Sequence, residues 1–266
     1  MHQFYRDKVV WITGASSGIG AALAYELAHF EIKLIISARR LHELQNLKES
    51  CTALPAEIYI LPFDLMALDT FESITNQVIG KFGRIDILFN NGGISQRSLA
   101  SETPIEVDRK IMEINFFANI RLSKCVLPFM LKQNYGHFVV TSSLSGKFGF
   151  YERSAYAASK HALHGFYEAL YLENRNQGIS VTMICPGSIK TNIAQAALNK
   201  EGLPALAKDE RLEKGMEASI CAQKIIKAVA NEKLEVLIGK SEVIPVFLKR
   251  FFPVIFWKLM YKLRPN

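Results

Sequence analysis

Cysteine is scarce in this chain, and the few cysteines present have no metal-binding or disulfide spacing. Four occur among 266 residues, and none forms a CxxC pair: Cys51, Cys125, Cys185 and Cys221. A secreted domain held by disulfides needs a denser set, and a structural zinc site needs closely spaced ligands. The pattern therefore excludes both classes, predicts no metal site and favours a reducing compartment, so we expect a cytoplasmic location.

Signals for secretion and for reading nucleic acid are also lacking. Charges at Arg6, Asp7 and Lys8 precede the first apolar run, so we expect no signal peptide. The net charge is +7, yet no DNA- or RNA-reading motif accompanies it. The basic balance fits an anionic cofactor and a membrane surface, and we expect no nucleic-acid partner. Ser143 does not stand in a Gly-x-Ser-x-Gly sequence, which excludes a hydrolase nucleophile elbow.

The remaining composition is that of a globular α/β protein. Hydrophobic residues make up 49% of the chain and charged residues 21%, which is enough apolar material for a sizeable core. Six short apolar segments alternate with helical stretches, at residues 9–12, 33–37, 58–65, 85–89, 136–143 and 180–185. This alternation predicts a single-domain, Rossmann-type, doubly wound parallel sheet with helices on both faces.

The first expected strand runs directly into a glycine-rich loop, which is followed by a helical stretch. Gly14 permits a tight turn, Gly18 lets the backbone approach a pyrophosphate, and Gly20 lets the helix pack close to the sheet. The amides and dipole at the helix N-terminus favour an anion there. A glycine turn without a ligand is the alternative, but the strand–loop–helix context favours nucleotide binding.

The second expected strand does not end in an acidic residue. A dinucleotide fold uses such an acid to bind the ribose 2′-hydroxyl of NAD. Ala38 stands at this place, followed by Arg39 and Arg40. A guanidinium pair suits a 2′-phosphate, so the sequence predicts NADP(H) as the preferred cofactor, with NAD(H) as the alternative. Two solvated arginines at the start of a helix would have no such role.

Tyr156 and Lys160 are four residues apart and therefore share one face of a predicted helix. An ammonium group beside the phenol would lower the tyrosine pKa towards the working range of an acid–base catalyst. Ser143 ends the fifth expected strand, and a loop can bring its hydroxyl to Tyr156. Asn115 lies in an apolar helical stretch, residues 104–132, where it either bonds to local backbone or disturbs the helix to hold a water.

In this order and spacing, the motifs resemble those of the classical short-chain dehydrogenase/reductase family over about the first nine-tenths of the chain. The similar segments are residues 13–20, 90–93, 156–160 and 186–191, with Asn115 and Ser143. One departure is Gly92, where the family usually has alanine. The resemblance implies a homodimer or homotetramer.

The resemblance also implies roles for these residues. Tyr156 would be the general acid or base, Ser143 would bind the substrate oxygen, and Asn115 would anchor a water that relays protons. Lys160 would lower the Tyr156 pKa and hold the nicotinamide ribose. Together with the residues argued above, the implied cofactor-binding set is Gly14, Ser16, Ser17, Gly18, Ile19, Gly20, Arg39, Arg40, Asp64, Leu65, Asn91, Gly92, Tyr156, Lys160, Pro186, Gly187, Ile189 and Thr191.

Two segments bear on the substrate. Residues 146–151 form an aromatic loop between Ser143 and Tyr156, which we expect to wall a pocket. Residues 192–216 resemble the variable substrate lid of the family, and we expect a helix from 194 to about 216. Both favour a small apolar carbonyl or alcohol, although aromatic loops also serve only to pack.

The C-terminal extension, residues 243–266, is apolar, aromatic and basic at once, and follows a catalytic domain expected over residues 1–242. Trp257 and Tyr261 beside Lys258 and Lys262 fit an interfacial helix on an anionic leaflet, peripheral to the membrane. The extension resembles that of membrane-associated family members close to the 11β-hydroxysteroid dehydrogenases. Packing across a subunit interface is the alternative.

The sequence thus predicts an NAD(P)(H)-dependent oxidoreductase that interconverts an apolar carbonyl compound and its alcohol, with Tyr156 as the general acid or base. Two alternatives remain open. One is a catalytically silent nucleotide-binding scaffold, and the other is a peripheral membrane protein whose main task is lipid binding.

Overall fold

A seven-stranded sheet forms the centre of the protein. The computed structural model describes residues 1–206 and 209–262. The strands are β1 (Val9–Thr13), β2 (Lys33–Ser37), β3 (Glu57–Ile60), β4 (Ile87–Asn90), β5 (Gly136–Thr141), β6 (Ile179–Pro186) and β7 (Glu235–Ile238). They lie in the order β3-β2-β1-β4-β5-β6-β7, and every pairing is parallel. The winding reverses between β1 and β4, which is the switch point of a doubly wound sheet.

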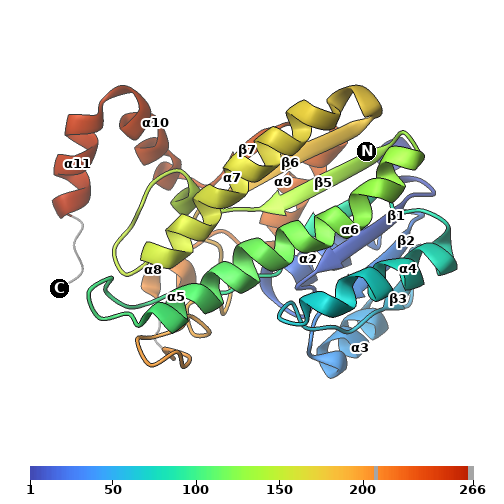
Figure 1. Ribbon diagram of the computed structural model, residues 1–266, viewed down its shortest axis with the longest axis horizontal. Helices are drawn as coiled ribbons and strands as arrows, with labels where there is room; N and C mark the ends of the chain where they lie inside the picture. Colours follow the sequence, from blue (N-terminus) through green and yellow to red (C-terminus); the bar gives the residue numbers. More distant parts are fainter. Residues whose placement is uncertain (207–208, 263–266) are drawn as a thin grey trace.

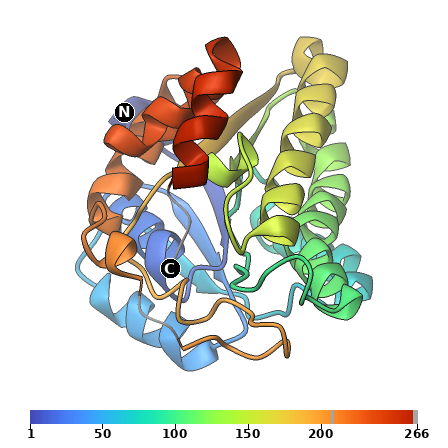
Figure 2. The same cartoon turned by 90° about the vertical axis from the view of Figure 1, so that its left-hand side faces the viewer.

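Helices cover both faces of this sheet (Figures 1 and 2). One face carries α2 (Gly18–Leu27), α3 (Leu41–Ser50) and α9 (Ala218–Ala230). The other carries α4 (Phe71–Phe82), α6 (Ala118–Lys132) and α7 (Ser154–Asn174). The central strands are buried on both faces, which is why they read as continuous apolar runs. The predicted single-domain Rossmann-type fold is confirmed.

The other helices are short or lie at the edges of the sheet. The α-helices among them are α1 (His2–Tyr5), α5 (Ile105–Met112), α8 (Glu210–Glu213), α10 (Ile244–Phe251) and α11 (Pro253–Lys262). Single turns of 3₁₀-helix are η1 (Leu68–Thr70), η3 (Leu144–Gly146), η4 (Arg175–Gln177) and η5 (Ser241–Val243), and η2 (Glu113–Phe117) is a π-helix.

The sheet differs from the sequence prediction at both edges. The prediction missed β7, which is only four residues long and pairs with β6 alone. The third strand is shorter than predicted and ends at Ile60. Pro62 has no N–H with which to continue a ladder. Asp64 therefore lies in the loop beyond the strand. Its carboxylate accepts from Met66 N at 3.0 Å and does not cap α4.

The predicted lid helix is wrong for most of its length. Within the described part of residues 194–216, only α8 is helical. The Asn199 side chain accepts from Glu201 N at 3.0 Å and from Leu203 N at 2.9 Å, so it closes a turn in competition with a helix. Gly202 has a φ of +73°, which ends helical geometry as well. Residues 207 and 208 of this segment lie outside the described residues.

The C-terminal extension forms α10 and α11, and it packs on the loop that follows η3 (Figure 1). The ring centroids of Phe148 and Phe256 are 5.5 Å apart, and Lys249 Nζ donates to Lys147 O at 2.9 Å. Phe148 of the predicted aromatic loop therefore packs against the extension. No helix within residues 1–206 and 209–262 is long and apolar enough to cross a membrane. Residues 263–266 of the predicted extension lie outside the described part.

Candidate active site

The predicted site residues gather where β1, β4, β5 and β6 end (Figure 1). These are the carboxyl ends of parallel strands on either side of the switch point, where open α/β sheets bind ligands. The loops after β2 and β3 bring the two arginines and Asp64 to the same edge. Tyr156 and Lys160 come from α7, and Asn115 comes from η2.

The glycine loop requires glycine at three positions. Gly14 and Gly18 have φ angles of +67° and +55°, which favour glycine. A β-carbon at Gly20 would collide with the carbonyl oxygen of Gly14, so only glycine lets α2 start this close to the strand. Ser17 takes the N-cap position in extended conformation, and its side chain does not cap the helix. The first α2 amides are therefore left for an anion, which is the donor set that a pyrophosphate needs.

The two arginines after β2 are held by different partners. Arg40 Nη2 donates to the Ser16 hydroxyl at 3.0 Å and to the Ser16 carbonyl at 3.2 Å. Arg39 Nη1 lies 4.0 Å from Asp64 Oδ2, and both side chains are largely exposed. Arg40 is therefore the arginine that joins the end of β2 to the glycine loop.

The turn after β4 is fixed to the glycine loop through Thr13. The amides of Asn91 and Gly92 both donate to Thr13 Oγ1 at 3.1 Å. The Asn91 carboxamide donates to Thr13 O at 3.2 Å. A β-carbon at Gly92 would lie 2.6 Å from Leu65 Cδ1, so glycine replaces the usual alanine at a place that Leu65 fills.

Tyr156 lies half-buried in the first turn of α7, with the Ser143 side chain as its hydrogen-bond partner. Burial raises the pKa of Tyr156, while the Ser143 hydrogen bond and the charge of Arg153 act in the opposite direction. Ser143 itself caps η3, and its hydroxyl accepts from Ser145 N at 3.1 Å. The two hydroxyls that the sequence predicted to meet are therefore together.

Lys160 is buried one turn further along α7. Its Nζ donates to Thr141 O at 2.7 Å and lies 5.8 Å from the centroid of the Tyr156 ring. Burial lowers the pKa of Lys160 to about 8. In this state the ammonium is held by the end of β5, and the Tyr156 pKa is governed by burial and by Ser143 and Arg153.

Asn115 bonds to backbone, but the partner is Ile94, 21 residues away, and not the local backbone. It sits within the π-helix η2, so the long helix predicted over residues 104–132 widens at this residue. Its Oδ1 accepts from Ile94 N at 2.8 Å, and its Nδ2 donates to Ile94 O at 2.9 Å and to Ser159 Oγ at 3.1 Å. Gly93 lies between Asn115 and Lys160: a β-carbon there would be 3.0 Å from Asn115 Oδ1 and 3.6 Å from Lys160 Nζ.

The segment after β6 completes the edge. A β-carbon at Gly18 would lie 3.1 Å from the Thr191 methyl group, so this segment meets the glycine loop. Ile189 is buried and pairs with Met216 of the lid. Gly187 and Ser188 meet an acid that sequence reasoning missed: Glu242 accepts from Ser188 N at 3.3 Å, and its side chain fills the space beside Gly187. Nothing in the local sequence marks Glu242, because its place depends on β7.

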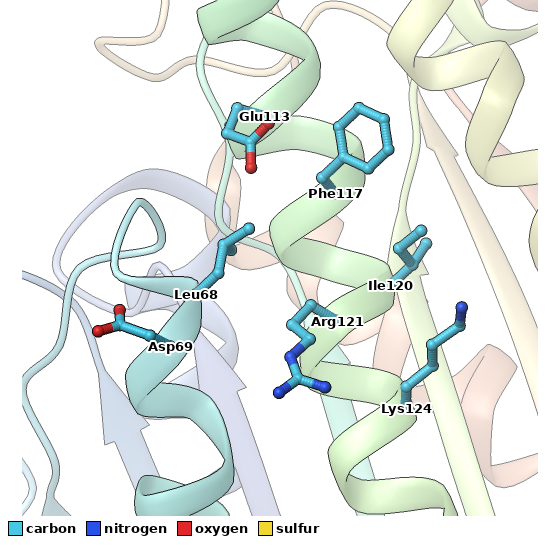
Figure 3. Close-up of a pocket in the computed structure, with 7 residues that line it drawn as sticks. All are labelled: Leu68, Asp69, Glu113, Phe117, Ile120, Arg121 and Lys124. Atoms are coloured by element: carbon cyan, nitrogen blue, oxygen red, sulfur yellow. The ribbon is translucent and has the colours of Figure 1, made fainter.

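Two further features lie outside the predicted set. A surface groove of about 410 Å³ lies between η1 on one side and η2 and α6 on the other (Figure 3). It is lined by Leu68, Asp69, Glu113, Phe117, Ile120, Arg121 and Lys124, none of which is a predicted site residue. The second feature is a group of three residues whose possible metal-ligand atoms lie within 4.8 Å of one another: His164, Cys185 and Glu235. Lys147 pairs with Glu235 there and lies 3.2 Å from His164 Nδ1, so a protein cation already balances the carboxylate.

A family model described as short chain dehydrogenase matches residues 8–202. The chain belongs to the short-chain dehydrogenase/reductase family. It is 39% identical over 263 residues to the human dehydrogenase/reductase SDR family member 7, covering 97% of this chain and 78% of that relative. It is 35% identical over 260 residues to the Drosophila melanogaster family protein 7-like, covering 96% and 80%.

Solved members of the family share the architecture. A short-chain dehydrogenase/reductase from Burkholderia phymatum in complex with NAD has a TM-score of 0.83 and 25% identity, covering 94% of this chain and 95% of that chain. Levodione reductase has a TM-score of 0.79 and 28% identity, covering 90% and 98%. The chain therefore has both the family signature and the fold of a dehydrogenase/reductase.

Proposed function

We propose that the protein is an NADP(H)-dependent oxidoreductase that interconverts a small apolar carbonyl compound and its alcohol. The observation that carries this proposal is the convergence of Tyr156, Ser143 and Lys160 at the end of β5, with a glycine cradle beside them. A scaffold that only binds nucleotide needs no such set of hydroxyls and ammonium. When bound, the nicotinamide supplies the hydride chemistry.

The residues of the chain supply positioning and proton transfer. Tyr156 gives its phenolic proton to the carbonyl oxygen during reduction, and takes a proton from the alcohol during oxidation. Ser143 donates a hydrogen bond to the same oxygen and stabilises the charge that develops there. Lys160 keeps the ammonium next to Tyr156 and binds the nicotinamide ribose. Asn115 holds a water through which protons pass from Lys160 to solvent.

The cofactor-binding residues divide by the part of the nucleotide that they meet. The loop and helix start around Gly14, Ser17, Gly18, Ile19 and Gly20 hold the pyrophosphate. Ser16, Arg39 and Arg40 form the site for the 2′-phosphate. Asp64 and Leu65 meet the adenine, the turn at Asn91 and Gly92 lies along the nucleotide, and the segment with Pro186, Gly187, Ile189 and Thr191 fixes the carboxamide.

Residues 1–242 form the catalytic domain in this proposal, with residues 192–216 as a lid over the substrate. Two copies or four assemble through α7 and through the continuous helix of η2 and α6, whose outer faces expose Leu172 and Phe117 respectively. The extension at residues 243–266 lies on an anionic membrane surface. Phe251, Val254 and Trp257 are 68%, 68% and 57% exposed there, and lysines adjoin them.

Tryptophan fluorescence during titration with NADPH and then NADH tests the cofactor, and a screen of apolar ketones and aldehydes with the bound nucleotide tests the reaction. The Tyr156→Phe variant is expected to lose at least about 100-fold in turnover, the usual contribution of a general acid. It should keep the same nucleotide affinity. Turnover that survives this substitution, or failure to bind either nucleotide, would overturn the proposal.

A further inference from the structure

Gln96 is a fully buried glutamine in the loop after β4, and every polar atom of its side chain is bonded. Its exposed fraction is 0%. Nε2 donates to the hydroxyls of Ser98, Thr103 and Ser154 at 3.4, 3.2 and 3.2 Å. Burial of an amide is costly without such partners. The backbone N–H groups of Ala155 and Tyr156 can only donate, so they fix which end of the carboxamide carries the oxygen.

That oxygen faces the start of α7. Gln96 Oε1 accepts from Ala155 N at 2.8 Å and from Tyr156 N at 3.3 Å. These are the second and third residues of α7, whose amides have no partner within the helix. The residue at the N-cap position is Arg153, and its side chain does not cap the helix. The cap comes instead from a residue 60 positions away in the sequence.

We infer that Gln96 is a positioning residue that caps α7 from outside the helix and thereby fixes the place of Tyr156. The first turn of a helix frays most readily, and Tyr156 lies in that turn. Lys160 does not depend on the cap in the same way, because Thr141 O anchors its ammonium. Loss of the cap should thus displace the phenol relative to Ser143 and leave Lys160 in place.

The loop that contains Gln96 is also hydrogen-bonded to the proposed lid, residues 192–216. Gln96 pairs with Leu198 in a β-bridge. Arg97 N donates to Leu198 O at 2.7 Å, and Leu198 N donates to Ser95 O at 2.9 Å. Gln96 therefore lies between the lid on one side and the first turn of α7 on the other. Gln96 is therefore one link between Leu198 of the lid and Tyr156, beside the packing of Leu198 in the same apolar cluster as Ala155.

Hydrogen exchange of peptides that span residues 150–162 tests the cap without any substrate. Gln96→Leu, which removes the carboxamide at similar volume, should speed exchange at Ala155 and Tyr156 about tenfold, since a buried hydrogen bond is lost. Gln96→Glu keeps an acceptor oxygen and should retain the protection. Gln133→Leu is the control: the Gln133 side chain also bonds to backbone, as a donor to the carbonyls of Ile85 and Tyr135, but away from α7.

A second experiment measures turnover, and it rests on the proposed role of Tyr156. Gln96→Leu should lower kcat about tenfold or more, because small displacements of a catalytic group are costly. The nucleotide Kd should stay within about twofold of wild type, because binding relies on other loops. If Gln96→Leu does not fold, Gln96→Asn takes its place, since it keeps the amide but is one methylene too short.

Unchanged exchange in Gln96→Leu would overturn the cap, and faster exchange with unchanged kcat would overturn its effect on Tyr156. If the wild-type protein turns over no carbonyl compound at all, the proposed function fails, and the exchange measurement still decides the cap.

Discussion

Arg40 reaches back from the end of β2 to the glycine loop, where its Nη2 lies 3.0 Å from the hydroxyl of Ser16. The guanidinium thus joins the end of β2 to the glycine loop. Arg39, in contrast, points towards Asp64. The sequence identified the two arginines as a pair, and the structure gives them separate partners.

Reversal of charge at Arg40 should weaken NADPH binding. Arg40→Asp removes a charge-assisted contact to the 2′-phosphate, worth about 1.5–3 kcal/mol, so the Kd for NADPH should rise about 10- to 100-fold. The Kd for NADH should change little. Fluorescence titration with both nucleotides measures the ratio, and Arg39→Asp should shift it in the same direction.

Arg6→Asp is the control for surface charge, since Arg6 pairs with Glu31 away from the site. An equal loss of NADPH and NADH affinity in Arg40→Asp would contradict a 2′-phosphate role.

Gly20→Ala should abolish nucleotide binding and destabilise the fold. The new β-carbon would meet the backbone of Gly14, which has no freedom to move away. Such a clash in a packed segment costs about 1–3 kcal/mol or more. Thermal unfolding and nucleotide titration measure the two effects.

Gly80→Ala provides the comparison, because a β-carbon at Gly80 of α4 would meet nothing within 4 Å. It should leave nucleotide binding unchanged and raise stability by about 0.5–1 kcal/mol, the helix penalty of glycine. Normal nucleotide affinity in Gly20→Ala would show that the close approach of α2 is not needed for the cradle.

His137 should make the protein less stable in acid. Burial lowers the pKa of this residue to about 3, and its Nε2 lies 2.8 Å from Thr182 Oγ1. Below about pH 6.5 the unfolded chain binds a proton at this histidine and the folded protein does not. The contribution of this histidine to the free energy of unfolding is therefore fully present above that pH. It is lost as the pH falls towards 3, by at most about 1.4 kcal/mol per pH unit.

Denaturant unfolding of wild type and His137→Gln between pH 7 and pH 4 measures this contribution. The variant should lose less stability across the interval than wild type, whereas His42→Gln, at an exposed position, should follow wild type. Parallel curves for wild type and His137→Gln would refute the assignment.

Removal of exposed apolar groups from the extension should weaken membrane binding. We expect Trp257→Ser combined with Phe251→Ser to reduce flotation with anionic vesicles at least about tenfold, since an aromatic side chain contributes about 1.5–3 kcal/mol when buried. Both residues are exposed, so the fold should persist. Phe256 is unsuitable for this test because it packs on Phe148.

Ile220→Ser, at an exposed position of α9, controls for general loss of apolar surface. Unchanged flotation of the double variant, with altered subunit association instead, would assign the extension to an interface between copies of the chain.

Local pattern was enough to predict the parts of the fold whose partners are near in sequence. The strand–loop–helix at Gly14 to Gly20 and the helical spacing of Tyr156 and Lys160 are of this kind. β7 and Glu242 could not be predicted, since both depend on pairing with β6 from a distant part of the chain. The lid helix was mispredicted because its apolar content suggested a helix, while the Asn199 side chain and Gly202 close turns.

Gln96 illustrates a different limit. Nothing in the sequence distinguishes a lone glutamine after a strand from an ordinary loop residue. Gln96 caps α7 only because the fold brings the two together. Asn115 was easier to single out, because an asparagine in an apolar helical stretch needs a reason.

The π-helix around Asn115 also sets the rotational phase of α6. It holds one residue more than an α-helical turn requires, and each residue advances a helix by about 100°. A chain one residue shorter here would turn α6 by that amount and carry Asn119 and Ser123 away from the Tyr167 hydroxyl, which now lies 3.4 Å from Asn119 O and 2.6 Å from Ser123 Oγ. The exact length of this segment is therefore as much a requirement of the fold as the identity of its residues.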